Sequence, residues 1–292
     1  MKKVQFKGGV VPYLFVLPQI IIILVFFIWP SVMAVYYSFE LQDAFGTSSQ
    51  FVGLLNYKDV LGDKDYYNSL SFTLIFSTLV TLFSLSTGLY LAHKANEVIK
   101  GKGLYRTLFI WPYAIAPAVV GLIATFLFNE SHGDLYHFLN QIGWKFDPKS
   151  DPFDAQVMLI FISSWKQVSV NFIFFLSGLQ GIPRSIVEAS KLDCKSDTRR
   201  FWSIIFPLLT PTTFFLLVTN ITYAFFDTFG IIDTTTRGTP MGQTKTLAYK
   251  IYQDGFLGAD VGGSSAQSVI LMLFVLIITI FQFKYIEKRV HY

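Results

Sequence analysis

The sequence has little of three things that many functional classes of soluble protein need. It has a single cysteine, Cys194, so no disulfide can form within the chain. Only 14% of its 292 residues are charged, whereas an ordinary soluble domain has about 25%. Its four histidines show no spacing that would gather metal ligands on one helix, and its net charge of +4 gives no reason to expect nucleic-acid binding.

Long apolar runs take the place of the missing charge. Hydrophobic residues make up 52% of the chain, and its mean hydropathy is +0.49. A bilayer core about 30 Å thick is crossed by about 20 helical residues. Six segments meet this requirement, at residues 12–37, 69–93, 105–128, 155–179, 208–229 and 264–286. We therefore predict an all-α, polytopic membrane protein with six transmembrane helices, in a single transmembrane domain over residues 1–292.

The first apolar run follows Lys2, Lys3 and Lys7, as the core of a secretory signal would. However, it exceeds the about 7–15 residues of a signal core, and no clear small-x-small cleavage site follows. We expect it to be retained as a span.

The placement of Lys and Arg predicts the orientation, because these residues gather in cytoplasmic loops. With the N-terminus inside, most of the 23 Lys and Arg lie in inner segments. We therefore expect both termini in the cytoplasm. The basic residues left on the outside are Lys58, Lys64, Lys145, Lys149, Arg237, Lys245 and Lys250.

The three outer loops, at about 38–68, 129–154 and 230–263, are longer than typical connections. They carry turn residues and scattered aromatic side chains, as ordinary membrane-surface loops do. Their length also leaves room for an external partner to dock.

A charged stretch lies between the fourth and fifth spans. It contains Glu188, Lys191, Asp193, Lys195, Asp197, Arg199 and Arg200. Each charge would cost roughly 2.5–3.5 kcal/mol at the centre of a spanning helix, so the stretch must lie in water or against another protein. A solvated basic loop would satisfy this condition by itself.

The residues of this stretch predict two short helices that meet at a turn. Glu188 is spaced to pair with Arg184 at i,i+4 and with Lys191 at i,i+3. A polar turn over residues 193–197 follows, and the second helix directs apolar side chains towards the membrane. The small Ala189 beside a carboxylate favours a docking surface over a plain loop.

The same stretch resembles the cytoplasmic coupling motif of binding-protein-dependent ABC importer permeases. The motif begins Glu-Ala-Ala, continues with Asp-Gly and ends in an Ile-x-x-Pro-like run. Here it is read in Glu188-Ala189-Ser190, in Asp193-Cys194 and in the run from Ile204 to Pro207. Ser190 keeps the small volume of Ala. Cys194 is the larger departure, because Gly would allow a positive φ: either the turn does not need one, or the helix adjusts.

The resemblance extends along nearly the whole chain. It is similar to the A-type permeases of sn-glycerol-3-phosphate importers, within the carbohydrate-uptake group. The stretches that carry it include FFIWP (26–30), PYAIAPAVV (112–120), WKQVSVNFIFF (165–175) and YAFFDTFGIID (223–233).

The resemblance implies a permease subunit in the bacterial cytoplasmic membrane, with a cytoplasmic coupling loop at 180–206. It implies four kinds of partner: a second permease, two ATPase subunits, an external substrate-binding protein and membrane lipid. By the same resemblance, Glu188 would contact a basic group on the ATPase. ATP and Mg would be bound by the ATPase and not by this chain. This chain has no cofactor of its own in that scheme, and permeases for neutral sugars or oligosaccharides remain the alternative.

The chain itself lacks a phosphate-binding loop. GTPMGQTKT at 238–246 does not have the G-x-x-x-x-G-K-[ST] spacing and falls on the outside. We therefore expect no catalytic site here and ATP hydrolysis on a separate subunit.

Polar residues within the spans are candidates for a substrate path. In the fourth span, Gln167 and Asn171 share a helix face, and Lys166 needs a water-filled cavity or an anionic partner. Asp227 in the fifth span is one candidate partner. Two interpretations remain open: the four residues line the path and Lys166 attracts a phosphate, or Lys166 forms a structural pair with Asp227 or bonds to the second permease.

Proline and glycine within the spans predict kinks or close packing at Pro112, Pro117, Gly121 and Gly88. Two other classes fit less well. A membrane enzyme would need a nucleophile near His132, Asp134 and His137, and a secondary transporter would show inverted repeats and usually more spans.

Overall fold

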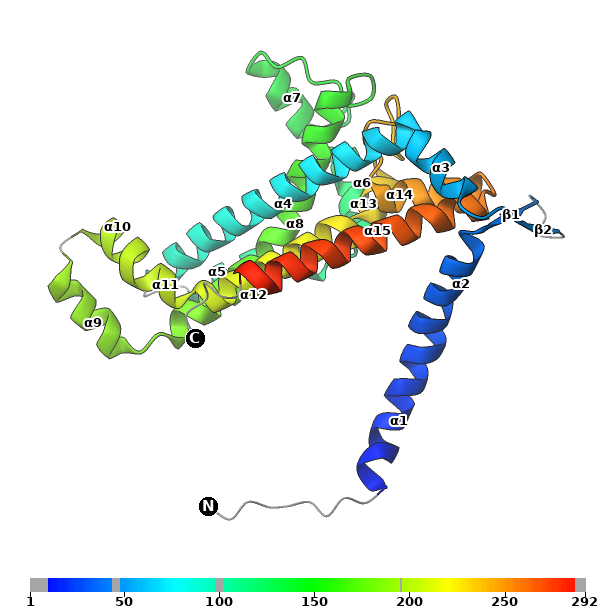
Figure 1. Ribbon diagram of the computed structural model, residues 1–292. Coiled ribbons are helices and arrows are strands. Elements are labelled where there is room, and N and C mark those ends of the chain that lie inside the picture. The colour runs from blue at the N-terminus through cyan, green and yellow to red at the C-terminus, as the bar shows by residue number, and fades with distance from the viewer. Residues whose placement is uncertain (1–9, 44–47, 98–101, 195, 287–292) are drawn as a thin grey trace. The chain divides into compact units, whose positions relative to one another are not determined.

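The computed structural model describes residues 10–43, 48–97, 102–194 and 196–286, and helices dominate them (Figure 1). One short hairpin, β1 (Glu40–Gln42) with β2 (Ser49–Phe51), is the exception. The all-α expectation is therefore confirmed. The chain divides into two compact units, residues 1–62 with 251–272 and residues 63–250 with 273–292. The single transmembrane domain expected over residues 1–292 stays a prediction.

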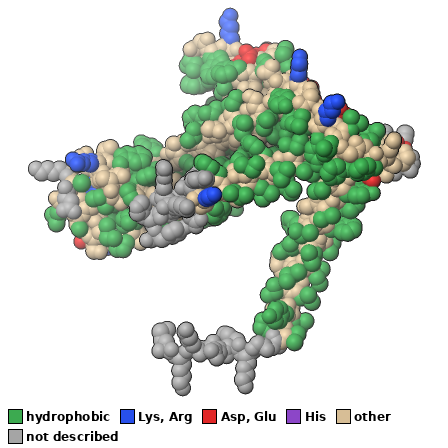
Figure 2. All heavy atoms as spheres, viewed as in Figure 1, with side chains coloured by type: hydrophobic (Ala, Val, Ile, Leu, Met, Phe, Trp, Pro, Cys, Tyr) green, Lys and Arg blue, Asp and Glu red, His purple; other side chains and the backbone are tan. Residues whose placement is uncertain are grey.

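The first unit begins with one long apolar helix. It consists of α1 (Val11–Ile23), a π-helical turn (Leu24–Ile28) and α2 (Trp29–Tyr37). No residue of its most apolar window is buried, and Figure 2 shows hydrophobic side chains along its visible surface. Such a helix is stable only in lipid or against another apolar surface.

A hairpin and a short helix complete this unit. β1 and β2 are antiparallel with Glu40 opposite Phe51, and α3 (Leu55–Gly62) follows. The buried Asn56 amide donates to the carbonyls of Ser38 (3.0 Å) and Glu40 (2.9 Å), which ties α3 to the hairpin. A side chain at Gly262, near the start of α15 (Val261–Phe281), would collide with the Glu40 carbonyl, so only glycine allows this approach.

The second unit is a bundle built on two long helices, α4 (Lys64–Glu97) and α8 (Pro152–Gly181). Between and after these two helices, the second unit contains α5 (Lys102–Ile110), a 3₁₀ turn (Trp111–Ala114), α6 (Pro117–Leu127), α7 (Asp134–Gln141), α9 (Arg184–Asp193), α10 (Asp197–Arg200), a π turn (Phe201–Ile205), α11 (Phe206–Leu208), α12 (Thr210–Thr222), a π turn (Tyr223–Asp227), α13 (Phe229–Thr234) and a π turn (Gln282–Ile286). α14 (Leu247–Tyr252) begins in the second unit and ends in the first, and a π turn at Gln253–Leu257 follows it in the first unit.

α4 and α8 can pack closely because Gly88 on α4 has no side chain. A Cβ there would lie 2.5 Å from the Asn171 Cβ and 3.2 Å from backbone atoms of α8. Around this contact the buried residues Phe172, Phe175 and Leu216 form an apolar core shared by α8 and α12.

Within the described residues, five helices are long and apolar enough to cross a membrane: Pro12–Tyr37, Lys64–Glu97, Pro152–Gly181, Thr210–Thr234 and Val261–Lys284. Each overlaps a predicted span, and two of them, Lys64–Glu97 and Pro152–Gly181, extend beyond the predicted span at both ends. The span predicted at 105–128 is instead a broken pair, Gly103–Ala114 and Pro117–Leu127, bent by 102°. The break between the two helices has a local cause, because a residue before proline avoids the α conformation and Ala116 before Pro117 is extended with ψ 142°.

The loops predicted on the outer side contain more structure than their turn residues indicate. In the loop predicted at 129–154, α7 is followed by a turn closed by the buried Asp154. Its carboxylate accepts hydrogen bonds from Trp144 Nε1 (3.0 Å) and the Asp147 amide (2.8 Å). A buried carboxylate is tolerated here because donors satisfy both of its oxygens.

Candidate functional site

The charged stretch folds into two helices at one end of the second unit, where α4 and α8 also end; α7 lies at the other end (Figure 1). α8 ends at Gly181, and Ile182 and Pro183 are extended before α9 begins. α10 begins after Ser196 and continues through the π turn into α11. The predicted pair of helices joined by a turn is confirmed.

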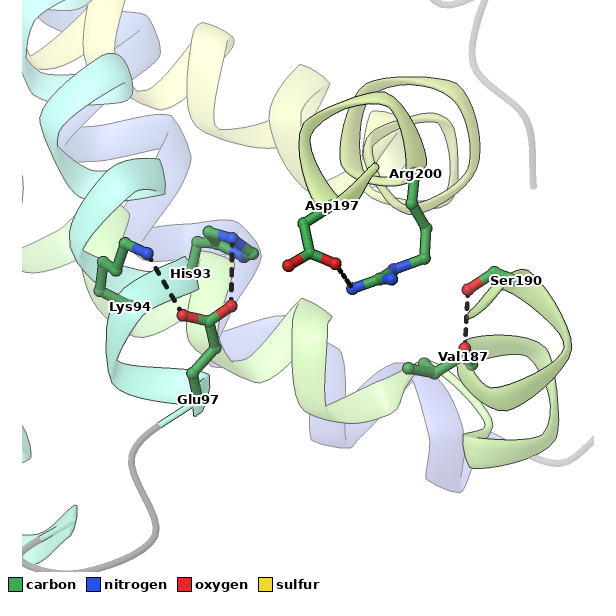
Figure 3. A network of polar contacts seen from close by, with 7 residues as sticks. All are labelled: His93, Lys94, Glu97, Val187, Ser190, Asp197 and Arg200. Carbon is green, nitrogen blue, oxygen red and sulfur yellow. Dashed lines mark hydrogen bonds and ion pairs between the residues drawn. The ribbon is translucent and has the colours of Figure 1, made fainter. Parts of the chain in front are cut away.

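α9 presents much of its surface to solvent. Glu188 and Ala189 are exposed, and Leu192 is 88% exposed. Ser190 is buried instead, and its hydroxyl donates to the Val187 carbonyl (2.7 Å, Figure 3). The small residue at this position therefore faces the protein, and the carboxylate of Glu188 is left available.

The side-chain pairs predicted on α9 do not form. Among the residues that the structure describes, no ion pair joins Glu188 to Arg184 or to Lys191. Exposed pairs of this kind contribute little, because water screens them and ordering two long side chains costs entropy. The side chain of Asp193, and Lys195, lie outside the described residues.

The turn between α9 and α10 does not need glycine. Cys194 has φ −127° and ψ 111°, which is extended backbone open to any residue. Of the two alternatives that the sequence left, the first holds: no positive φ is required at this position. Cysteine therefore replaces the glycine of the motif without backbone strain.

Figure 3 shows polar contacts within the segment and at the neighbouring end of α4. Arg200 pairs with Asp197 on the same helix at 2.8 Å. At the end of α4, Glu97 lies 3.6 Å from His93 and 3.3 Å from Lys94, and the His93 ring packs on Phe201 with centroids 4.6 Å apart. The last contact joins α4 to the helix that leads out of the segment.

Pro207, the last residue of the motif, lies half-buried in α11 between the charged segment and the fifth span. Its carbonyl accepts a hydrogen bond from the Thr210 hydroxyl (2.7 Å). Together with Leu209, which is buried in the core cluster, this contact fixes where the segment joins α12.

The predicted path residues of α8 are used within the chain. Asn171 is fully buried and exchanges two amide hydrogen bonds with Asn220 of α12, at 3.0 and 2.7 Å. Gln167 is 4% exposed, and its carbonyl accepts a third bond from Asn171. In an apolar environment such amides stabilise helix pairing, because each would otherwise remain unpaired.

Among the described residues, no ion pair within 4 Å joins Lys166 to Asp227, its candidate partner. The Lys166 ammonium donates to the backbone carbonyls of Ile115 (2.8 Å) and Tyr113 (3.3 Å). Lys166 is 7% exposed, whereas Asp227 is exposed at the end of a π turn. The expected requirement for an anion or a water-filled cavity is met instead by carbonyl groups.

Asn220 was missed by the sequence analysis, although a signal was present. It is a polar residue in the middle of an apolar span, which by itself marks a candidate for function or helix pairing. What the sequence does not show is its partner, which lies 49 positions away on α8.

One sizeable hollow is mostly apolar, and Lys166, Gln167 and Asn171 are not among its lining residues. Its volume is about 790 Å³, and it lies between α4, α5 and α8, with walls that include Phe83, Leu108, Trp111 and Trp165. A strongly hydrated solute would find few partners there. Among the described residues, no cluster of three or more His, Cys, Asp or Glu could hold a metal ion.

Comparison with known proteins places the chain in a family. Residues 68–292 match the family described as "Binding-protein-dependent transport system inner membrane component". The chain is 52% identical over all of its length, and all of the relative's, to the "sn-glycerol-3-phosphate transport system permease protein UgpA" of Agrobacterium fabrum. It is 45% identical to the protein of the same name from Escherichia coli, covering 98% of this chain and 97% of the relative.

Solved structures share the fold at low identity. A bacterial ABC transporter involved in the import of the acidic polysaccharide alginate has a chain with TM-score 0.82 and 21% identity, covering 95% of each chain. The MetNI methionine ABC transporter gives TM-score 0.54 and 15% identity, covering 78% of this chain and 97% of that one. With a multi-pass helical fold and a family match over most of its length, the chain belongs to the inner membrane permease components of binding-protein-dependent transport systems.

Proposed function

We propose that this chain is the A-type permease subunit of an importer for sn-glycerol-3-phosphate, with glycerophosphodiesters as further substrates. The observation that carries the substrate is full-length identity of 52% and 45% to permeases named for it. A permease for neutral sugars or oligosaccharides is the competing assignment. The hollow between α4, α5 and α8 is lined mostly by apolar side chains, with only Thr87, Gln156, Ser164 and Ser169 as polar members, so its lining favours neither assignment.

In this proposal α9 and α10 dock on a cytoplasmic ATPase. The support is an exposed carboxylate at Glu188 beside an almost fully exposed Leu192, on a helix that projects where α4 and α8 end. Ala189 is exposed beside Glu188, Ser190 packs inward, Cys194 turns the chain, and Pro207 connects the segment to the fifth span. Asp193, whose side chain lies outside the described residues, is a further candidate for the contact. Closure of the ATPase pair around ATP and Mg would then pull on α8 and α12.

The proposal requires further subunits and one orientation. A second permease completes the pathway, two ATPase subunits lie below, and an external binding protein delivers the substrate above. Both termini and the α9–α10 segment lie in the cytoplasm. Charge placement supports this orientation, because the outer loops hold few of the Lys and Arg residues.

The test is uptake of labelled sn-glycerol-3-phosphate into proteoliposomes that hold this chain, its companion permease, the ATPase and the binding protein. We expect ATP-dependent accumulation that is lost when this chain is omitted. ATP-driven uptake of a neutral sugar without glycerol phosphate would keep the transporter class and overturn the substrate.

Coupling has its own test, because Glu188 is exposed and makes no ion pair within the described chain. Glu188→Ala is expected to reduce substrate-stimulated ATP hydrolysis about tenfold, as loss of a charged contact at an interface does, with normal assembly in the membrane. Glu130→Ala, which removes an exposed carboxylate from an outer loop, is the matched control and should leave hydrolysis unchanged. Unchanged coupling in Glu188→Ala would count against the docking role.

A further inference from the structure

The broken third span leaves two backbone carbonyls without their helical partners. In a continuous helix the carbonyl of Tyr113 would accept from residue 117, but that residue is a proline and has no N–H. The carbonyl of Ile115 would accept from Val119, whose amide donates instead to Ala116 at 3.0 Å. Inside a membrane, carbonyl groups without a donor are costly, so the break needs an outside donor.

Lys166 of α8 supplies that donor. Its ammonium lies 2.8 Å from the Ile115 oxygen and 3.3 Å from the Tyr113 oxygen, and 5.8 Å from the centroid of the Tyr113 ring. The carbonyl end of a helix carries partial negative charge, so a cation is the donor best suited to it. The same carbonyl oxygens solvate the Lys166 ammonium, because the side chain is only 7% exposed and has little contact with water.

An adjacent aromatic contact holds the same two segments together. Trp111, in the 3₁₀ turn before the break, meets Trp165 of α8 edge to face with ring centroids 6.0 Å apart. On the far side of the break, Gly230 of α13 lies against Pro117 and Ala118. The first arm of the broken span is therefore fixed to α8, and the second to α13.

We propose that Lys166 is a positioning residue that sets the bend of the broken span, and that it acts on transport through this bend and not by binding the substrate. Its reach from α8 fixes where α5 ends and α6 begins. Rocking of α8 with the α9–α10 segment would then change the angle between the two arms. This last step rests on the proposed function, whereas the effect of Lys166 on the bend does not.

The bend can be measured directly by electron paramagnetic resonance in the assembled complex. Spin labels at Leu104→Cys and Leu122→Cys, both exposed, report the two arms once Cys194→Ser removes the native thiol. A straight helix would place these positions about 27 Å apart, at about 1.5 Å per residue. We expect a shorter, narrow distance in the otherwise unchanged chain and in Lys166→Arg, and a longer or broadened one in Lys166→Met. The same distribution in Lys166→Met would overturn the proposal.

Uptake kinetics separate positioning from substrate binding. A positioning role predicts that Lys166→Met lowers the maximal rate about tenfold, in line with the cost of an unpaired buried carbonyl. It also predicts little change in KM and recovery in Lys166→Arg. A raised KM for the phosphorylated substrate with an unchanged bend would instead make Lys166 a ligand. If no substrate is transported even by the unsubstituted complex, the distance measurement still decides the role of Lys166.

A second variant covers the case in which Lys166→Met does not fold. Pro117→Ala restores the amide that the Tyr113 carbonyl lacks, so Lys166→Met with Pro117→Ala is expected to accumulate as folded complex. Pro112→Ala is the matched control. The amide that it creates would donate to the carbonyl of Leu108, four residues earlier, and would reach neither the Tyr113 nor the Ile115 carbonyl. Equal recovery of folded complex by Pro117→Ala and Pro112→Ala in the Lys166→Met background, or recovery by neither, would contradict the proposal.

Discussion

Polar residues occupy two regions of this membrane protein, and they are used in opposite ways. Between the spans, Asn171, Asn220 and Lys166 are buried and bonded to one another or to backbone. On the α9–α10 segment, Glu188 is exposed and no ion pair holds it within the described chain. In lipid a polar group must find its partner inside the fold, whereas in water it can be kept for another protein.

The comparison predicts that substitutions between the spans destabilise the fold, and that substitutions on the segment change coupling with little effect on stability. The following experiments test this difference, from the largest expected effect to the smallest.

Gly88→Ala should destabilise most, because its methyl group would lie 2.5 Å from the Asn171 Cβ and backbone atoms of α8 are 3.2 Å away. Overpacking of this kind costs about 1–3 kcal/mol. We expect a lower midpoint of thermal unfolding for the purified protein. Gly62→Ala, where a Cβ would meet nothing within 4 Å, is the control. Equal midpoints for the two variants would mean that α4 and α8 do not pack as closely as described.

Asn171→Leu should cost about 1–2 kcal/mol, because it leaves the Asn220 amide buried without its side-chain partner. The double variant Asn171→Leu with Asn220→Leu removes both amides and should recover part of that loss. Thermal unfolding of the two single variants and the double variant gives the coupling energy. Strict additivity would contradict a direct amide pair.

Cys194→Gly tests whether the turn between α9 and α10 gains anything from glycine. Because Cys194 is extended, with φ −127°, glycine relieves no strain there and only adds freedom to the unfolded chain. We expect a loss of about 0.5–1 kcal/mol at most. A gain in stability, measured by the same thermal unfolding, would show that this turn favours a positive φ.

The smallest effect is a pH dependence outside the spans. Asp63 lies between α3 and α4, and partial burial alone would raise its pKa. Hydrogen bonds from the Asp65 amide and from Lys250, whose nitrogen is 3.1 Å away, outweigh this and hold the pKa of Asp63 below its usual range. The ionised form therefore stabilises the fold above about pH 4, and this contribution is lost as pH falls through the lowered pKa.

Asp63→Asn should flatten this part of the profile. We expect the midpoint temperature of the unsubstituted protein to fall more steeply between about pH 5 and pH 3 than that of the variant. Because the Asp63 side chain is 39% exposed, the difference should be small and should shrink further in high salt. Parallel profiles would mean that Asp63 contributes nothing through its charge.

Much of the fold was predictable because hydropathy is a local property. Each of the six apolar runs corresponds to a long helix or to the broken pair. The helices of the charged stretch were also predictable, from proline and glycine before them and from their amphipathic pattern. Two prolines marked the third span as a candidate for a kink, but they did not give the size of the bend, which depends on what packs on each arm.

The site was predictable in its residue types and not in its partners. The sequence marked Lys166, Gln167 and Asn171 as unusual, and it suggested Asp227 as the partner of Lys166. The geometry gives the carbonyls of Tyr113 and Ile115 instead. A side chain that finds a backbone carbonyl leaves no pattern in the sequence, because every residue has one.

The sequence by itself determined that the chain is a multi-pass membrane protein and that the charged stretch lies outside lipid, because both follow from the free energy of transferring residues between water and hydrocarbon. Three further features appear only in the folded chain: Lys166 donates to the carbonyls of Tyr113 and Ile115, Asn171 pairs with Asn220, and Cys194 lies in extended backbone. These depend on groups far apart in the chain reaching hydrogen-bonding distance, and on backbone angles that packing selects.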